Sequence, residues 1–316
     1  MLRWQAEKPA IFSSIPLINL EEVMAKIGFV GLGNMGFPMA LNLKNAGHEV
    51  TGFDVSEAAR EAAISEGMNS SDSLEHVADG ADIVITMLPN GEISKSVASQ
   101  LLPSMQEGSL LIDCSTIDVA SAKTVHQMAS DAGKLCLDAP VSGGVGGASA
   151  GTLTFMVGGS DQAFSDGSDV LDVMGQKAVH CGDGGAGQSA KICNNMLLAI
   201  SMIGTCEAFA MAEKLGLDQD KLFDVVSTSS GSCWSVNTYC PVPNVGPKSP
   251  SDNNYQPGFA ASLMNKDLNL AMEAAKDANA QTPLGAHAAA LYKAMVENGH
   301  GDLDFSAMIN ILDEMK

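Results

Sequence analysis

Basic residues are scarce in this 316-residue chain: 17 Lys and Arg stand against 37 Asp and Glu, which gives a formal charge of −20 at pH 7. A surface of that charge repels phosphate backbones and anionic lipid headgroups, so nucleic acid and membranes are not expected partners. The sequence also lacks any uninterrupted apolar run approaching the roughly 20 residues that a membrane-spanning helix needs. These absences predict a water-soluble protein.

Paired cysteines and clustered histidines are absent too. The seven cysteines are an odd number without a C-x-x-C pair, which favours free thiols in a reducing compartment. The six histidines include no H-E-x-x-H motif and no group at metal-ligand spacing, so we expect no metal site. The chain is about two average domains long and has the composition of a globular protein.

Residues 1–24 are predicted to be an N-terminal extension that precedes the folded domains. A secretory signal has a basic start and an unbroken apolar region, and this segment has neither. A mitochondrial presequence is rich in Arg and poor in acids, whereas here Arg3 and Lys8 are offset by three glutamates. Met24 leads directly into the first predicted strand and resembles a natural start. We therefore expect a cytoplasmic protein.

From residue 26 onward, short apolar runs alternate with helical patterns. Strands are predicted at 27–30, 49–54, 83–88, 110–114 and 135–139, with a further strand-like run at 153–157. Helices are predicted at 36–46, 56–66 and 119–132. This alternation is typical of a parallel sheet that helices cover on both faces. Residues 25–187 are therefore predicted to form a doubly wound (Rossmann) α/β domain.

After residue 187 the strand patterns almost disappear. Residues 188–215 form one long predicted helix, apolar on nearly all sides, as expected for a buried helix that joins two domains. More helices are predicted near 218–227, 263–278 and 285–298, with a long loop at 234–256. Residues 188–316 are therefore predicted to be an all-α C-terminal domain.

The strongest functional signal is a dinucleotide-binding fingerprint at the end of the first strand, Gly31-Leu32-Gly33-Asn34-Met35-Gly36. Its three glycines permit a tight turn, the close approach of a pyrophosphate and the packing of a helix onto the strand. Asp54 ends the second strand, where a carboxylate binds the ribose 2′-hydroxyl and repels a 2′-phosphate. No Arg occupies the five positions after it. The sequence thus predicts NAD as the cofactor, although Asp54 is also compatible with a simple helix-entry role.

Lys191 and Asn195 are the candidate catalytic residues. They lie four positions apart, and hence on one helix face, early in an otherwise apolar helix. Burial lowers the pKa of a lysine toward neutrality, which suits a general base for an alcohol proton. Two structural explanations stay open, a lysine that extends to solvent from the first turn and an interface amide whose hydrogen bonds are satisfied.

Three further features allow both a functional and a structural interpretation. The glycine-rich segment that begins Ser142-Gly143-Gly144 either holds a carboxylate with its N–H groups or forms a flexible turn. The pair Lys266-Asp267 opens a predicted helix and by itself is typical of a solvated face. Trp234 is compatible with core packing.

Six spaced motifs together resemble the β-hydroxyacid dehydrogenases, over about residues 25 to 316. They are Gly-Leu-Gly-Asn-Met-Gly at 31–36, Met-Leu-Pro-Asn at 87–90, Asp-Cys-Ser-Thr-Ile at 113–117, Asp-Ala-Pro-Val-Ser-Gly-Gly at 138–144, Gly-Gln-Ser-Ala-Lys-Ile-Cys-Asn-Asn at 187–195 and Leu-Met-Asn-Lys-Asp-Leu at 263–268. They occur in the order found in that family.

The resemblance assigns expected roles to residues at matching positions. Leu88 and Pro89 match further cofactor contacts, and Thr116 matches a residue near both nicotinamide and substrate. Lys266 matches a cofactor-contacting lysine of the second domain, which replaces the solvated-face interpretation. Trp234 lies in the segment where relatives of different substrate preference diverge, and is expected to contact the substrate.

The substrate and catalytic groups follow in the same way. Ser142, Gly143 and Gly144 match the loop that binds the substrate carboxylate. Lys191 matches the catalytic lysine, and Asn195 the amide that positions the substrate.

The resemblance also implies a reaction. Segments 154–159, 196–205 and 231–235 are most similar to the branch that acts on 3-hydroxyisobutyrate in valine catabolism. We therefore expect NAD-dependent oxidation of this hydroxy acid to methylmalonate semialdehyde, by a homodimer or homotetramer. The alternatives are a reductase of tartronate semialdehyde, succinic semialdehyde or glyoxylate, a phosphogluconate dehydrogenase, and a non-catalytic NAD-binding sensor.

Overall fold

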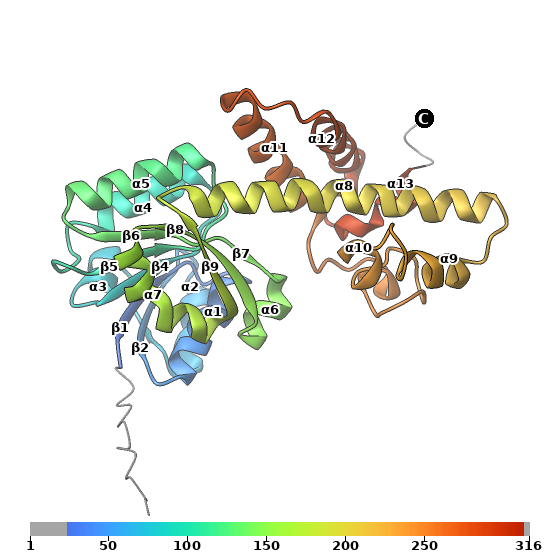
Figure 1. Cartoon of the computed structure of the whole chain (residues 1–316). Coiled ribbons are helices and arrows are strands. Elements are labelled where there is room, and N and C mark those ends of the chain that lie inside the picture. The colour runs from blue at the N-terminus through green and yellow to red at the C-terminus, as the bar shows by residue number, and fades with distance from the viewer. Residues whose placement is uncertain (1–23, 313–316) are drawn as a thin grey trace, which may run out of the picture.

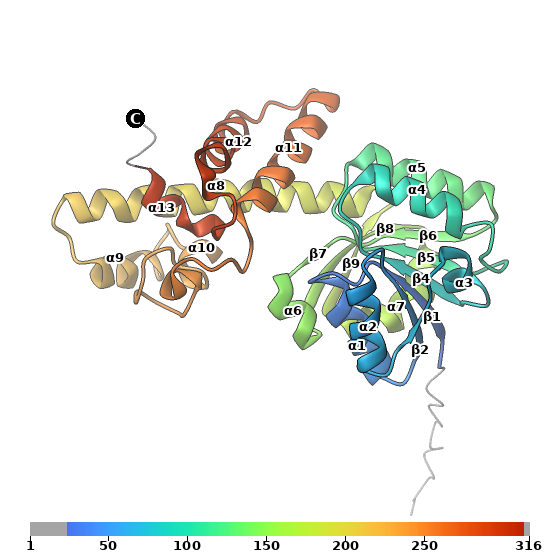
Figure 2. The ribbon, with the colours of Figure 1, turned by 180° about the vertical axis from the view of Figure 1, so that it is seen from behind.

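The computed structural model describes residues 24–312, so the predicted N-terminal extension lies outside the described residues except for Met24. The described residues form a sheet domain and a helical domain, joined by one long helix (Figures 1 and 2). The sheet contains β1 (Lys26–Val30), β2 (Glu49–Phe53), β3 (Asn69–Ser70), β4 (Ile83–Thr86), β5 (Leu110–Asp113), β6 (Leu135–Asp138), β7 (Val141–Ser142), β8 (Leu153–Gly159) and β9 (Gly175–Gly182).

The first six strands are parallel in the order β3-β2-β1-β4-β5-β6, which is the doubly wound arrangement predicted from the sequence. The rest of the sheet differs from that prediction. β8 runs antiparallel to β6 and to β7, and β9 pairs parallel with β8. The sheet is therefore mixed, because the chain reverses direction after β6.

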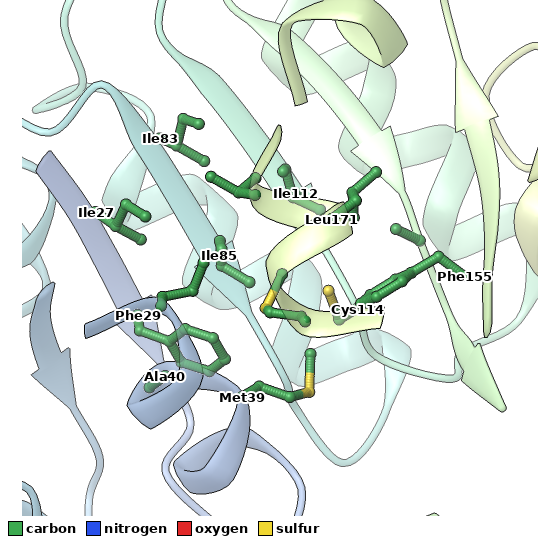
Figure 3. Packing of buried hydrophobic residues seen from close by; sticks show 14 of the residues in the cluster. Ile27, Phe29, Met39, Ala40, Ile83, Ile85, Ile112, Cys114, Phe155 and Leu171 are labelled. Carbon is green, nitrogen blue, oxygen red and sulfur yellow. The ribbon is translucent and has the colours of Figure 1, made fainter. Parts of the chain in front are cut away.

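Helices cover both faces of this sheet. They are α1 (Gly36–Asn45), α2 (Glu57–Ser65), α3 (Leu74–Ala78), α4 (Gly91–Leu101), α5 (Val119–Asp131), α6 (Gly144–Ala150) and α7 (Asp161–Met174). On one face, Met39 and Ala40 of α1 and Leu171 of α7 pack against Phe29 and Ile85 (Figure 3). A separate apolar cluster under α3, α4 and α5 closes the other face.

The glycine-rich segment after β7 is not the flexible turn that its composition allows. Gly143 adopts a φ of 135°, and α6 begins at the next residue. Ala148 of α6 is fully buried and packs in the same cluster as α1. Tertiary packing therefore stabilises a helix whose glycines give it little intrinsic propensity.

The second domain is built around α8 (Ala186–Lys214), the long helix predicted from the sequence. The other elements are α9 (Gln219–Val226), α10 (Trp234–Asn237), η1 (Pro250–Asn253), α11 (Ala261–Asp277), α12 (Pro283–Met295), η2 (Val296–His300), η3 (Phe305–Ala307) and α13 (Met308–Ile311). The predicted long loop at 234–256 thus contains two short helices. Tyr292, Phe305 and Met264 lie in the core of the domain, where α8, α11 and α12 meet.

Helix α8 has 29 residues, and by length and composition alone it is apolar enough to cross a membrane, although polar residues interrupt its apolar runs. The expectation that α8 is buried on most sides is wrong, because Leu197 and Met211 on one face are more than half exposed. Meanwhile its first turns insert between the carboxyl ends of the sheet and α11, and they carry the polar residues Gln188, Lys191 and Asn195, all buried.

Candidate active site

The fingerprint loop has the shape that a dinucleotide requires. Gly31 has a φ of 95°, and a Cβ there would overlap the carbonyl oxygen of Met87. A Cβ on Gly36 would overlap Gly31 O, so helix α1 packs directly on the loop. Gly33, by contrast, is exposed, and a Cβ added there would meet no atom within 4 Å. Packing therefore explains the first and third glycines, while the second leaves open space for a ligand.

The start of α1 is suited to an anion. The helix has no side chain that caps its N-terminus, and the exposed residues Gly33 and Asn34 precede it, followed by half-buried Met35. Free N–H groups and the helix dipole at such a terminus attract phosphate. These residues fit the pyrophosphate of a dinucleotide.

Asp54 lies immediately after β2, beside this loop. Its carboxylate accepts hydrogen bonds of 2.8 Å from the main-chain N–H groups of Leu32 and Ser56. Arg60, the sixth residue after it, donates from Nη1 to the carbonyl oxygen of Asp54 at 2.6 Å. This cation lies next to the predicted ribose site, one position beyond the five residues after Asp54 that contain no Arg.

Lys266 brings the helical domain against the other predicted cofactor residues. From α11, its Nζ donates to Pro89 O at 2.7 Å and to Thr116 O at 2.8 Å. Leu88 lies in the same loop and donates from its N–H to the hydroxyl of Ser115 at 2.7 Å. The loops that follow β4 and β5 are thus tied to each other and to α11.

Lys191 lies on the first turns of α8 and is only 7% exposed. Its Nζ donates to Val141 O at 2.8 Å, next to Ser142. Burial lowers the pKa of Lys191, an effect that Lys266 reinforces and the carboxylate of Asp267 opposes. The lysine does not extend to solvent, so the structural explanation left open by the sequence is wrong.

Asn195 is buried one turn further along α8. Its Nδ2 donates to Asp267 Oδ2 at 2.6 Å, and its Oδ1 accepts from Asn194 at 3.0 Å. Asp267 is buried as well, and burial raises the pKa of its carboxyl group against the opposing effects of Lys191 and Asn195. The solvated-face interpretation of the Lys266-Asp267 pair is therefore wrong for both residues.

Trp234 connects to the Ser142–Gly144 loop through neighbours that sequence reasoning missed. Half exposed at the start of α10, it stacks on Tyr239 with ring centroids 4.8 Å apart. A Cβ on Gly258 would lie 2.6 Å from the hydroxyl of Tyr239, and a Cβ on Gly144 would lie 3.4 Å from Gly258 O. Tyr239, within the predicted loop at 234–256, and Gly258, just after it, therefore form a wall beside the glycine loop.

Asp267 is a further residue of the site to which the sequence assigned no function. It lies three residues after Met264 and four before Ala271, both buried, so helical spacing alone places it on the inner face of α11. That spacing was the available signal.

Among residues 24–312, no group of three or more His, Cys, Asp or Glu side chains could hold a metal ion.

Comparison with known proteins agrees with this geometry. Residues 26–182 match the model of the NAD-binding domain of 6-phosphogluconate dehydrogenase, and residues 185–312 match that of the NAD-binding region of NADP-dependent 3-hydroxyisobutyrate dehydrogenase. A probable 3-hydroxyisobutyrate dehydrogenase of Mycobacterium tuberculosis is 50% identical over 92% of this chain and 98% of its own. The human mitochondrial 3-hydroxyisobutyrate dehydrogenase is 46% identical over 91% of this chain and 87% of its own.

Solved structures give the same result. The Mycobacterium tuberculosis 3-hydroxyisobutyrate dehydrogenase with L-serine superposes with a TM-score of 0.89 over 92% of this chain and 99% of its own, at 50% identity. A 3-hydroxyisobutyrate dehydrogenase from Salmonella typhimurium, 29% identical, gives a TM-score of 0.75 over 91% of this chain and 99% of its own. Both domains match models of NAD(P)-binding domains, and relatives match across nearly the whole chain. This protein therefore belongs to the 3-hydroxyisobutyrate dehydrogenase family of NAD-dependent oxidoreductases.

Proposed function

We propose that this enzyme oxidises 3-hydroxyisobutyrate to methylmalonate semialdehyde, a step of valine breakdown, with Lys191 as general acid/base. The observation that carries the proposal is the contact of Lys191 Nζ with Val141 O, 2.8 Å away and next to Ser142. It supports a site in which an ammonium or amine group lies beside a loop able to bind a carboxylate. The names of close relatives support the choice of acid.

The chain's own residues perform three tasks in this mechanism. The Ser142 hydroxyl and the N–H groups of Gly143 and Gly144 bind the substrate carboxylate. Neutral Lys191 takes the proton of the C3 hydroxyl, and in the reverse direction its ammonium form returns a proton to that oxygen. Asn195, oriented by Asp267, directs its amide toward the substrate. When bound, the nicotinamide supplies the acceptor for the hydride that leaves C3.

We propose NAD rather than NADP as the preferred cofactor. The carboxylate of Asp54 lies at the end of β2, where it would repel a 2′-phosphate. Arg60 stands next to it and could attract such a phosphate, but its Nη1 already donates to the main chain of Asp54. The matching model of the second domain is described for NADP-dependent enzymes, so the preference rests on Asp54.

The test is NADH formation by purified protein with (S)-3-hydroxyisobutyrate, D-glycerate and 4-hydroxybutyrate, each with NAD and with NADP. The proposal expects the highest kcat/KM for 3-hydroxyisobutyrate with NAD. Preference for D-glycerate or 4-hydroxybutyrate would instead move the enzyme to a sister activity, and preference for NADP would overturn the argument from Asp54.

We also propose that the protein works in the cytoplasm as a homo-oligomer. Leu197, Gly204 and Met211 are exposed at seven-residue intervals on α8, so they share one helix face. An apolar helix face of that length suits a second copy of the chain. Sedimentation equilibrium should give a dimer or tetramer, and Leu197→Glu with Met211→Glu should shift it toward the monomer. Cell fractionation tests the compartment.

A further inference from the structure

The start of α8 is fastened to the sheet domain by two buried side chains that the mechanism above does not use. Asp138, at the end of β6, is 1% exposed, and Gln188, in the first turn of α8, is 0% exposed. We call these two residues the latch. Buried polar groups such as these are costly unless they are fully paired.

Asp138 binds the N-terminus of α8. Its Oδ1 accepts from the N–H of Gly185 at 2.7 Å and lies 2.9 Å from Nε2 of His126. Its Oδ2 accepts from the N–H of Gln188 at 2.9 Å. A carboxylate at this place satisfies N–H groups that the helix itself cannot pair, and it complements the helix dipole. The cap comes from the other domain, 47 residues earlier in the chain.

Gln188 binds the loop that follows β5 and contains Thr116. Its Oε1 accepts from the N–H of Ile117 at 3.1 Å, and its Nε2 donates to Ser115 O at 2.7 Å. The amide therefore holds the peptide groups on both sides of Thr116, whose own carbonyl accepts from Lys266. Thr116 is the residue expected next to the nicotinamide.

Two glycines let the helix approach this closely. A Cβ on Gly158 of β8 would lie 2.8 Å from the N–H groups of Ala186 and Gly187. A Cβ on Gly187 would overlap Met156 O and lie 2.6 Å from Asp138 O. The helix end thus rests directly on the main chain of the sheet domain.

Lys191 follows Gln188 by three residues, hence by about one helical turn. Val141 and Ser142 likewise follow Asp138 by three and four residues. We propose that Asp138 and Gln188 are positioning residues. They hold the turn of α8 that carries Lys191 in register with both the Ser142–Gly144 loop and the loop after β5 that contains Thr116. The inference rests on the proposed function, because the register matters only if Lys191 acts on a substrate at that loop.

The test compares Gln188→Met, which has a similar length but no amide, with Gln127→Met on the exposed face of α5 as matched control. Displacing reacting groups by about 1 Å can cost a factor of about 100 in rate. We expect kcat with 3-hydroxyisobutyrate to fall by about 10- to 100-fold in Gln188→Met, with the NADH dissociation constant, from fluorescence titration, within about threefold of wild type. Hydrogen exchange of the Ile117 amide should accelerate in that variant and stay unchanged in Gln127→Met.

Asp138→Asn gives a second measurement if Gln188→Met does not fold. Because the Asn oxygen replaces only one of the two carboxylate acceptors, a smaller loss of kcat is expected, again without loss of NADH binding. A folded Gln188→Met enzyme with kcat within twofold of wild type overturns the proposal. A loss of kcat that matches an equal loss of NADH-binding sites indicates unfolded protein, and the decision then passes to Asp138→Asn, where a folded enzyme with kcat within twofold of wild type overturns the proposal.

The wild-type enzyme separates this proposal from the proposed function. If wild type prefers D-glycerate or 4-hydroxybutyrate, the proposed substrate is wrong. The comparison of Gln188→Met with Gln127→Met, repeated with the preferred acid, then tests the positioning role of Asp138 and Gln188. If wild type turns over no hydroxy acid, both proposals fail.

Discussion

At the scale of a single residue, burial and two neighbouring charges together set the pKa of Lys191. It is surrounded by protein, contacts a carbonyl oxygen and lies in the field of one carboxylate and one second lysine. A methionine has similar length and fits the same space without a titratable group. We expect Lys191→Met to lower kcat by about 100-fold or more, the usual scale for a lost general acid/base. Retained NADH binding by fluorescence would show that the fold is intact, and near-normal turnover would contradict the assigned role.

Asp267 gives a prediction of pH dependence. Its carboxylate raises the pKa of Lys191 against the lowering effect of burial. Asp267→Asn removes that charge, so the pKa of Lys191 falls further. Because oxidation requires neutral Lys191, the rising limb of kcat/KM against pH should move to lower pH. In the reverse reduction, which requires the protonated form, the falling limb should move in the same direction.

The matched control for this pH profile is Asp277→Asn, at the exposed end of the same helix. It should leave both limbs in place. An Asp267→Asn profile that superposes on wild type would show that Asp267 does not influence the ionisation that controls turnover.

Asp54 and Arg60 give a prediction of cofactor choice. Asp54→Asn removes the charge that repels a 2′-phosphate and leaves the guanidinium of Arg60 beside it. We therefore expect the ratio of kcat/KM for NADP to that for NAD to rise by about tenfold or more, since one lost charge repulsion at short range amounts to about 1.4 kcal/mol. Adding Arg60→Gln should reverse most of that gain. An unchanged ratio would place the discrimination elsewhere.

At the scale of the elements, α8 depends on glycine where it meets the sheet and not where it faces solvent. Gly187→Ala would introduce a Cβ against two carbonyl oxygens, and such overpacking typically costs about 1–3 kcal/mol of stability. Gly204 lies on the face of the same helix that is exposed in a single subunit, and a Cβ there would meet nothing within 4 Å of its own chain. Gly204→Ala should therefore stabilise the separate subunit by up to about 1 kcal/mol. Thermal unfolding of both variants in the Leu197→Glu/Met211→Glu background, where the proposed interface is disrupted, tests the contrast.

How well each element could be predicted depended on how local its causes are. Buried strands such as β4 and β5 are continuous apolar runs, and α8 has a long apolar middle, so sequence pattern sufficed. α4 and α7 were missed although Asn90 and Ser160 cap them, because their apolar positions are sparse. β9 was missed because it is an edge strand in which only Gly175 is buried, so its sequence has no clear apolar alternation.

The candidate site divides along the same line. The fingerprint and the Lys191/Asn195 pair are each contained in one short segment, so spacing and motif resemblance were enough to find them. The long-range side-chain hydrogen bonds of Asp138, Gln188 and Asp267 join residues 47 to 73 positions apart, and no local pattern encodes such pairs. Only the three-dimensional arrangement assigns them.

At the scale of the whole molecule, the excess of acidic residues predicts a response to salt. Lys–carboxylate pairs such as Lys221–Asp224 and Lys293–Glu297 are exposed and only three or four residues apart in sequence, and such pairs add little stability. The surplus carboxylates behind the net charge of −20 therefore repel one another in the folded state. We expect Tm to rise as NaCl increases from about 0.01 M to about 0.3 M, the range over which screening changes most. A Tm that falls or stays constant would contradict this account.

The cap that Asp138 provides for α8 also bears on whether the molecule can be dissected. A fragment that ends before residue 185 contains every strand of the sheet and the whole fingerprint. It would nevertheless leave the carboxylate of Asp138 facing only His126, without the two main-chain N–H groups that it binds in the intact chain. The nucleotide-binding half is thus not an independent module, since the carboxylate at the end of β6 depends on main-chain N–H groups at the start of α8.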